Sequence, residues 1–157
     1  MEGITYSRFK IGDRFVTARR TITEFDVMQY VTFTGFIEPL FLDHEFIRDK
    51  SLAGKLIAPG GLTFALVEGL AVQTGIIHGT GRAFVGINRM TLSLPLFIGD
   101  TIQAEIEVIE KKDRPALGGG IVTFRHDVRK ADGNRVMTYE ILRLIAEARH
   151  ADTLGAF

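Results

Sequence analysis

One segment of this chain, residues 57–75 with the sequence IAPGGLTFALVEGLAVQTG, contains a single charged side chain, that of Glu68. Its apolar residues recur at helical spacing and also fill the opposite side, and a helix that is apolar all round is buried all round. Gly69 and Glu68 interrupt a segment that is already short for a membrane span. We therefore predict a central helix, and the rest of the chain must supply the surface that encloses it.

The predicted helix begins at a pair of glycines. The N–H groups of Gly60, Gly61 and Leu62 have no acceptor inside a helix that starts here. Together with the helix dipole, these groups favour an oxygen that carries or develops negative charge. Glycine also lets a ligand carbonyl approach the backbone. The alternative is that the pair is only a turn in front of a core helix, and the sequence leaves both interpretations open.

The composition indicates one globular domain over residues 1–157. Hydrophobic residues make up 46% of the chain and charged residues 24%, which suits a single full core. Nineteen basic residues balance nineteen acidic ones, so nothing favours a nucleic-acid partner. The chain has no cysteine and no two histidines at metal-ligand spacing, so we predict neither a metal nor another cofactor. The N-terminus lacks the apolar run of a secretory signal, and we expect a cytoplasmic protein with no membrane span.

The first half of the chain predicts one strand and two helices before the central helix. Residues 14–22 have strand composition, and Thr23 is a good N-cap for a helix that ends at Gly35. Residues 36–42 form an apolar loop around a proline, which should pack against something. Residues 43–50 predict a short polar helix.

The second half predicts four strands that form a meander. The strands are expected at residues 83–97, 101–110, 121–130 and 135–148. The second strand alternates most regularly, which gives it one buried face. Residues 113–120 suggest a flexible loop, whereas Asp132-Gly133 indicates a tight hairpin turn. The pattern does not fix which face of its strand His126 occupies. The fold class is therefore α+β, with an antiparallel sheet packed on one long helix.

Three motifs, in this order, resemble those of one known family. They are ITEFDVMQYVTFTG leading into PLFLDHEF, then IAPGGL, and finally LPLFIGDTIQAEIEVIEKK. The chain resembles the MaoC-like dehydratases and R-specific enoyl-CoA hydratases of the hot-dog fold, in which a long antiparallel sheet wraps a central helix. The resemblance covers about residues 14–145.

This resemblance implies a function in fatty acid metabolism. Members of the family bind acyl thioesters of coenzyme A or acyl carrier protein. They are lyases that add water to a trans-2-enoyl thioester to give the R-3-hydroxyacyl product. The acyl chain lies under an overhanging segment, beside the central helix. The proteins form homodimers or higher assemblies in which two sheets join edge to edge, and here residues 83–97 would supply that edge.

The catalytic signature of the family is altered in this chain. The family sequence Gly-Asp-x-Asn-Pro-Leu-His-x-Asp aligns with GFIEPLFLD, so the catalytic Asp and His fall on Phe36 and Phe41. Phenylalanine neither accepts nor donates a proton, and the pair would turn a water site into an apolar wall for an acyl chain. A rearranged acid–base set is then drawn from Glu38, Asp43 and His44. The alternative is that Asp43 and His44 only cap or solvate the short helix.

Glu68 suggests a different reaction. Hot-dog thioesterases of the phenylacetate type have a His-Gly-Gly sequence followed by a helix carboxylate. Here PGG stands at that place, and Glu68 follows its second glycine by seven residues. An unpaired buried carboxylate is costly, so Glu68 is either a catalytic acid with a raised pKa or a structural partner of Arg89 or Asn88 across a dimer.

Three functions therefore stay open from the sequence: a hydratase, a thioesterase, and a non-catalytic acyl-CoA-binding subunit. The residues expected to contact the substrate are Phe36, Phe41, Gly60, Gly61, Leu62 and Arg89. Arginine is suited to the phosphates of coenzyme A, although a solvated surface charge is the commoner explanation.

Overall fold

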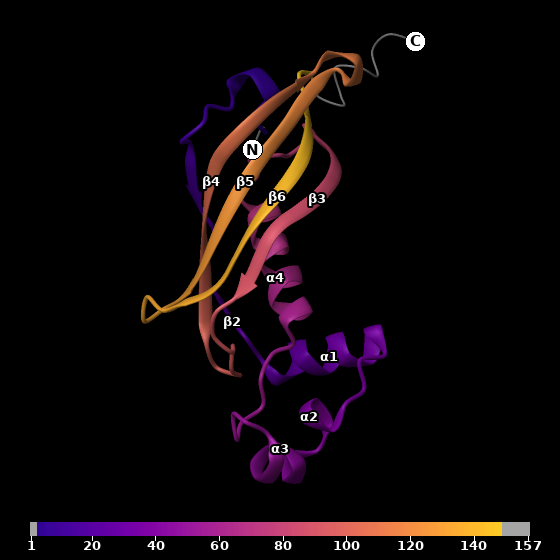
Figure 1. Ribbon diagram of the computed structural model, residues 1–157, viewed down its shortest axis with the longest axis vertical. Coiled ribbons are helices and arrows are strands. Elements are labelled where there is room, and N and C mark those ends of the chain that lie inside the picture. Colours follow the sequence, from indigo (N-terminus) through magenta and orange to yellow (C-terminus); the bar gives the residue numbers. More distant parts are fainter. Residues whose placement is uncertain (1–2, 149–157) are drawn as a thin grey trace.

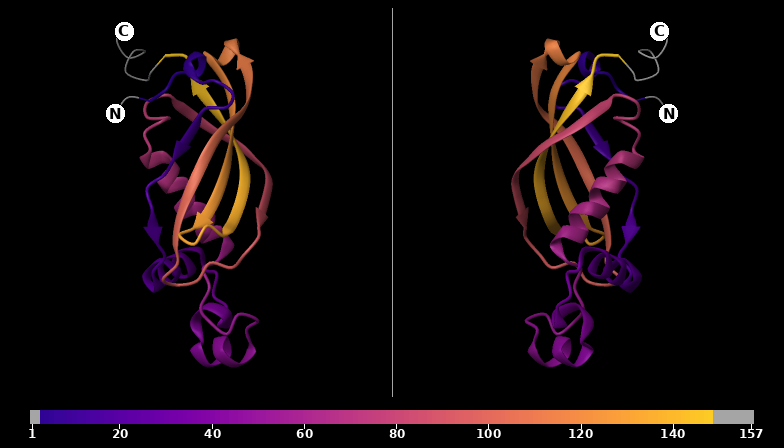
Figure 2. Two further views of the ribbon diagram at one scale, coloured as in Figure 1. Left: turned by 90° about the vertical axis from the view of Figure 1, so that its left-hand side faces the viewer. Right: turned by 90° about the vertical axis from the view of Figure 1, so that its right-hand side faces the viewer.

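The computed structural model describes residues 3–148 and has one antiparallel sheet curved around helix α4 (Figures 1 and 2). The helices are α1 (Glu24–Thr34), α2 (Pro39–Leu42), α3 (His44–Lys50) and α4 (Gly60–Gln73), with 3-10 turns η1 (Tyr6–Arg8) and η2 (Pro115–Leu117). The strands are β1 (Arg14–Val16), β2 (Arg20–Thr21), β3 (Gly81–Leu92), β4 (Thr101–Arg114), β5 (Gly119–Lys130) and β6 (Arg135–Ala146). The α+β hot-dog architecture expected from the sequence is confirmed.

The sheet has the strand order β1-β4-β5-β6-β3, and β2 also pairs with β4. Strand β4 shows the predicted alternation, since Ile102, Ala104, Ile106 and Val108 are all buried. Helix α4 lies along the concave side of the sheet, while α2 and α3 project beyond the end of the sheet (Figure 2). Strand β3 forms one edge and exposes large apolar side chains.

Helix α1 begins and ends as the sequence predicts. The Thr23 hydroxyl accepts from the Asp26 N–H at 3.3 Å, and the Asp26 carboxylate accepts from the Thr23 N–H at 2.9 Å. This reciprocal pair is a capping box. Gly35 ends the helix in the left-handed region at φ 70°, where glycine carries no steric penalty.

The predicted strand at residues 14–22 is wrong, because it is split into β1 and β2. At the break, the Thr17 hydroxyl accepts the Ala104 N–H at 3.0 Å, in place of a backbone carbonyl. The Thr17 carbonyl in turn accepts a hydrogen bond from the Gln103 side-chain amide at 2.7 Å. The side chains therefore interrupt the ladder without leaving these buried groups unpaired.

Three other predicted boundaries also differ. Residues 39–42 of the apolar loop form α2, because Pro39 at the first turn has a φ suited to a helix. The predicted flexible loop at 113–120 is shorter than expected, because β4 runs to Arg114, β5 begins at Gly119, and η2 lies between them. A Cβ on Gly119 would lie 2.0 Å from the Ile145 carbonyl oxygen, so this glycine permits close packing. Strand β3 spans 81–92 instead of 83–97, and its register shifts at Gly86 as expected for a bulge.

None of the helices between residues 3 and 148 combines the length and the apolar character needed to cross a membrane. The same residues contain no group of three or more His, Cys, Asp or Glu side chains placed to hold a metal ion.

Candidate functional site

The first turn of α4 offers three backbone donors. Pro59 precedes the helix and supplies no side-chain cap, and the first backbone bond runs from the Thr63 N–H to the Pro59 carbonyl at 3.0 Å. Within residues 3–148, no hydrogen bond uses the N–H groups of Gly60, Gly61 or Leu62. This turn can therefore bind an oxygen that develops negative charge.

Both glycines of this turn are closely approached by side chains. A Cβ on Gly60 would lie 2.7 Å from Leu92 Cδ2, and a Cβ on Gly61 would lie 2.1 Å from the Tyr30 hydroxyl oxygen. A larger residue at either position would therefore require Leu92 or Tyr30 to move. The neighbour at Gly61 is polar, which places a phenol hydroxyl beside the free N–H groups.

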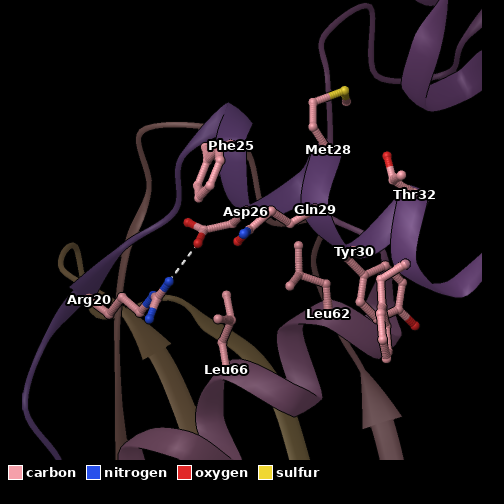
Figure 3. Close-up of a pocket in the computed structure, with 10 residues that line it drawn as sticks. Arg20, Phe25, Asp26, Met28, Gln29, Tyr30, Thr32, Leu62 and Leu66 are labelled. Carbon is pink, nitrogen blue, oxygen red and sulfur yellow. Dashed lines mark hydrogen bonds and ion pairs between the residues drawn. The ribbon is translucent and has the colours of Figure 1, made fainter.

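A cavity of about 730 Å³ lies between α1 and the first half of α4 (Figure 3). Its walls are mostly apolar, and they include Phe25, Met28, Tyr30, Phe33, Leu62 and Leu66. Arg20 and Asp26 lie at the far side from Tyr30 and form an ion pair of 2.5 Å (Figure 3). Burial by itself raises the pKa of Asp26, but hydrogen bonds from Thr23 and Arg20 lower it below its usual value.

The structure does not bring the three predicted acid–base residues together. Asp43 caps α3, because its carboxylate accepts from the N–H groups of Glu45 and Phe46 at 3.0 Å each. The exposed His44 faces Glu24, with 3.7 Å between Nε2 and Oε1. The carboxylate of Asp43 is therefore used as the N-cap of α3, which is the alternative that the sequence left open.

Glu38 is the remaining member of that set. It precedes α2 but makes no side-chain cap, and within the described chain its carboxylate has no hydrogen bond or ion pair. It lines a second cavity of about 640 Å³ between the α2–α3 segment and the β3–β4 connection. Leu40, Phe46, Ile57 and Phe97 form apolar walls there.

Phe36 and Phe41 pack against each other, with ring centroids 5.4 Å apart. Phe41 is 6% exposed and belongs to the core, whereas Phe36 is 47% exposed. Neither residue lines the two cavities described above. Together they form an apolar contact at the two positions where the resemblance predicts that the family has its catalytic Asp and His.

Glu68 is paired within its own chain. The Tyr139 hydroxyl donates to Glu68 Oε1 at 2.6 Å, and the Arg143 guanidinium donates to Oε2. Glu68 and Arg143 are each 15% exposed. The expected partners Arg89 and Asn88 are therefore replaced by Arg143 and Tyr139.

His126 is the fourth member of a cluster that also contains Glu68, Tyr139 and Arg143. It is 2% exposed, its ring stacks on Tyr139 at 4.4 Å between centroids, and its Nε2 lies 3.9 Å from Glu68 Oε1. Burial, followed by the charge of Arg143, lowers the pKa of His126 to about 3, so the imidazole is neutral at pH 7. Burial, followed by the charge of Glu68, raises the pKa of Tyr139.

Arg89 lies on the edge strand β3, and within the described residues it has no hydrogen bond or ion pair with any member of this cluster. It is the one non-glycine residue with a positive φ, 51°, among residues 3–148. Its guanidinium is exposed and lies 3.7 Å from Glu140. The register shift between Asn88 and Thr91 accompanies this backbone conformation.

Sequence reasoning missed Tyr30, His126, Tyr139 and Arg143. Strand periodicity carries a signal for two of them, because Tyr139 and Arg143 are four residues apart and share one face of β6. Tyr30 carries no comparable signal, since in sequence it is one more apolar residue of α1. Only the crossing of α1 over α4 brings its hydroxyl to Gly61.

Comparisons with known proteins agree with this architecture. The family model described as MaoC like domain matches residues 8–129. A solved structure of a monoamine oxidase regulatory protein from Archaeoglobus fulgidus is 32% identical, with a TM-score of 0.86 over 94% of this chain and 97% of that chain. No curated protein matches the chain significantly.

Two further solved structures share the fold at lower identity. The R-hydratase PhaJ1 from Pseudomonas aeruginosa is 23% identical, with a TM-score of 0.78 over 93% of this chain and 88% of that one. A MaoC-like dehydratase from Rhodospirillum rubrum is 24% identical, with a TM-score of 0.78 over 91% of this chain and 98% of that one.

Proposed function

Because this chain belongs to the MaoC-like domain family, we propose that it binds acyl thioesters at the first turn of α4 and hydrates the enoyl form. The observation that carries the proposal is the set of free N–H groups at Gly60, Gly61 and Leu62 beside a large apolar cavity. The thioester carbonyl oxygen accepts from these groups, which stabilises the negative charge that develops during water addition. The acyl chain occupies the cavity between α1 and α4, and the acid–base group acts on the bound thioester from the second cavity, which Glu38 lines.

Glu38 is the acid–base residue that this proposal favours. Water addition needs a base for the water and an acid for the α-carbon. The Glu38 carboxylate has no partner in the described chain, whereas Asp43 is engaged as a helix cap. Both carboxylates belong to the segment that overhangs the helix in this family.

Crotonyl-CoA tests the reaction. We expect enoyl absorbance to fall without release of free thiol, and Glu38→Gln to reduce the rate by about a hundredfold. Asp43→Asn is the matched control, because it removes a carboxylate from the same segment. We expect it to lower the melting temperature and to keep most of the hydration rate. A Glu38→Gln variant with an unchanged hydration rate would contradict the assignment of Glu38.

A second candidate function is that of a non-catalytic acyl-thioester-binding subunit. The Phe36–Phe41 contact favours it, because these side chains cannot transfer protons. This candidate predicts that crotonyl-CoA raises the melting temperature without being consumed. The thioesterase alternative is less favoured, since Glu68 is already paired with Arg143 and Tyr139. Release of free thiol that stops in Glu68→Gln would support it.

We also propose that two copies pair through strand β3. Edge strands with unpaired backbone groups are normally covered, and β3 exposes Phe84, Val85 and Leu92. On the neighbouring face of α4, Gly61, Ala65, Gly69 and Val72 are also exposed. Such a pairing would extend the sheet and cover both apolar surfaces.

A further inference from the structure

The hydroxyl of Tyr30 is held at the first turn of α4 without a partner in the described chain. Tyr30 is half-buried, and its ring packs against the core. No hydrogen bond within residues 3–148 involves its hydroxyl oxygen, although its backbone carbonyl accepts from the Thr34 hydroxyl at 2.6 Å. The oxygen is also not among the fully buried polar atoms, so solvent or a ligand can reach it.

The helix that carries Tyr30 is capped at both ends and tied to the sheet at its first turn. The capping box at Thr23 and the left-handed Gly35 define the limits of the helix, and the Arg20–Asp26 ion pair ties its first turn to β2. Tyr30 therefore approaches α4 from a helix whose first turn is anchored to β2. Figure 3 shows its ring at one end of the cavity, above the start of α4 and opposite Arg20.

The contact at Gly61 gives the direction of the hydroxyl. A Cβ on Gly61 would lie 2.1 Å from the Tyr30 hydroxyl oxygen but 3.1 Å from Cζ, so the oxygen is the part of the side chain that meets the helix. The oxygen therefore lies beside the N–H groups of the same turn. A carbonyl oxygen bound by those groups is within the reach of this donor.

We propose that Tyr30 is a catalytic residue that donates a hydrogen bond to the thioester carbonyl oxygen, next to the backbone donors of α4. This inference rests on the proposed acyl-thioester function and adds a side-chain donor to that site. During hydration the oxygen of water bonds to the β-carbon, a proton reaches the α-carbon, and the carbonyl oxygen carries negative charge in between. Tyr30 keeps its proton throughout and stabilises that charge.

Tyr30 also compensates in part for the altered signature. Phe36 and Phe41 remove two polar groups from the overhanging segment, whereas Tyr30 supplies one from α1. The consequence is a site whose polar contacts to the thioester come from one phenol and three backbone groups. Most of its other walls are apolar, and its two charged lining residues, Arg20 and Asp26, are paired with each other.

The test is Tyr30→Phe, which removes only the hydroxyl. We expect kcat for crotonyl-CoA hydration to fall about ten- to a hundredfold with a small change in KM, because the donor acts on charge that develops in the transition state. Tyr6→Phe is the matched control, since it removes a hydroxyl that donates to Asp113 at 2.6 Å instead of one near α4. We expect that control to keep the wild-type kcat.

The infrared carbonyl stretch of bound crotonyl-CoA gives a second readout that a structural role would not move. We expect a lower frequency in the wild type than in Tyr30→Phe. If the wild type binds or hydrates crotonyl-CoA while Tyr30→Phe has the same kcat and the same carbonyl frequency, the role of Tyr30 is overturned and the proposed function stands. If the wild type neither binds nor consumes the thioester, both proposals fail.

Discussion

At the scale of single residues, the cluster of Glu68, Tyr139, Arg143 and His126 has the largest electrostatic consequences. It places one carboxylate and one guanidinium between α4 and the sheet, where each is 15% exposed. Removing one member of such a buried ion pair lowers the free energy of unfolding, because the other charge is left without a partner.

Replacing Glu68 by Gln should therefore lower the free energy of unfolding by about 2–4 kcal/mol, because the Arg143 charge loses its partner. The double variant Glu68→Leu/Arg143→Leu should recover most of that loss, since it removes both charges together. Denaturant unfolding of Glu68→Leu, Arg143→Leu and the double variant measures this coupling. Strictly additive losses would show that the two side chains do not stabilise each other.

His126 makes stability depend on pH. Its pKa is about 3 in the folded protein and about 6.5 when unfolded, so only the unfolded chain takes up this proton between those values. The free energy of unfolding therefore falls as the pH drops from about 6.5 towards 3, by at most about 1.4 kcal/mol per pH unit from this residue.

His126→Phe should weaken this pH dependence and preserve the ring that stacks on Tyr139. The same replacement at the exposed His78 is the control and should leave the pH dependence unchanged. Urea unfolding at a series of pH values gives the comparison. Parallel curves for the wild type and His126→Phe would contradict the assignment of a buried neutral imidazole.

At the scale of elements, two exposed glycines of α4 differ in their surroundings, and only one of them contacts α1. Gly61 faces the Tyr30 hydroxyl, whereas a Cβ on Gly69 would meet nothing within 4 Å. The same glycine-to-alanine change thus tests packing at one position and helix propensity at the other.

Gly61→Ala should destabilise the protein by about 1–2 kcal/mol, because the new methyl group displaces Tyr30. Gly69→Ala should stabilise it by up to about 1 kcal/mol through helix propensity. Adding Tyr30→Phe to Gly61→Ala should recover part of the loss, as the closest atom is then gone. Thermal unfolding of these variants checks the prediction, and a stabilising Gly61→Ala would rule out the contact.

At the scale of the whole molecule, the two edges of the sheet differ. Strand β1 is a short edge, whereas β3 is a long edge that exposes several apolar side chains. A long exposed apolar edge favours pairing with another chain. The assembly state should therefore depend on β3 and be insensitive to β1.

Val85→Glu on β3 should convert a dimer into a monomer, because a charge would be buried at the paired edge. Val16→Glu on the opposite edge is the matched control, since Val16 is 60% exposed on β1 and Val85 is 49% exposed on β3. Light scattering coupled to size-exclusion chromatography measures the mass of each. An unchanged mass for Val85→Glu would locate any assembly elsewhere.

Local sequence determined much of this fold. The apolar run at 57–75, the alternation in β4 and the capping box at Thr23 each depend on residues that are close in sequence, and all three were predictable. The break at Thr17 was not predictable, because it depends on Ala104 and Gln103, which lie more than eighty residues away.

The candidate site divides in the same way. The glycine turn can be predicted from the residues themselves, and the free N–H groups follow from where the helix starts. The replacement of the family's Asp and His by Phe36 and Phe41 stays a prediction from the resemblance. The ion pair of Glu68 with Arg143 and the approach of Tyr30 to Gly61 were decided only by the tertiary structure. The physical reason is that both are contacts between separate elements, and their geometry depends on how α4 packs against β6 and α1.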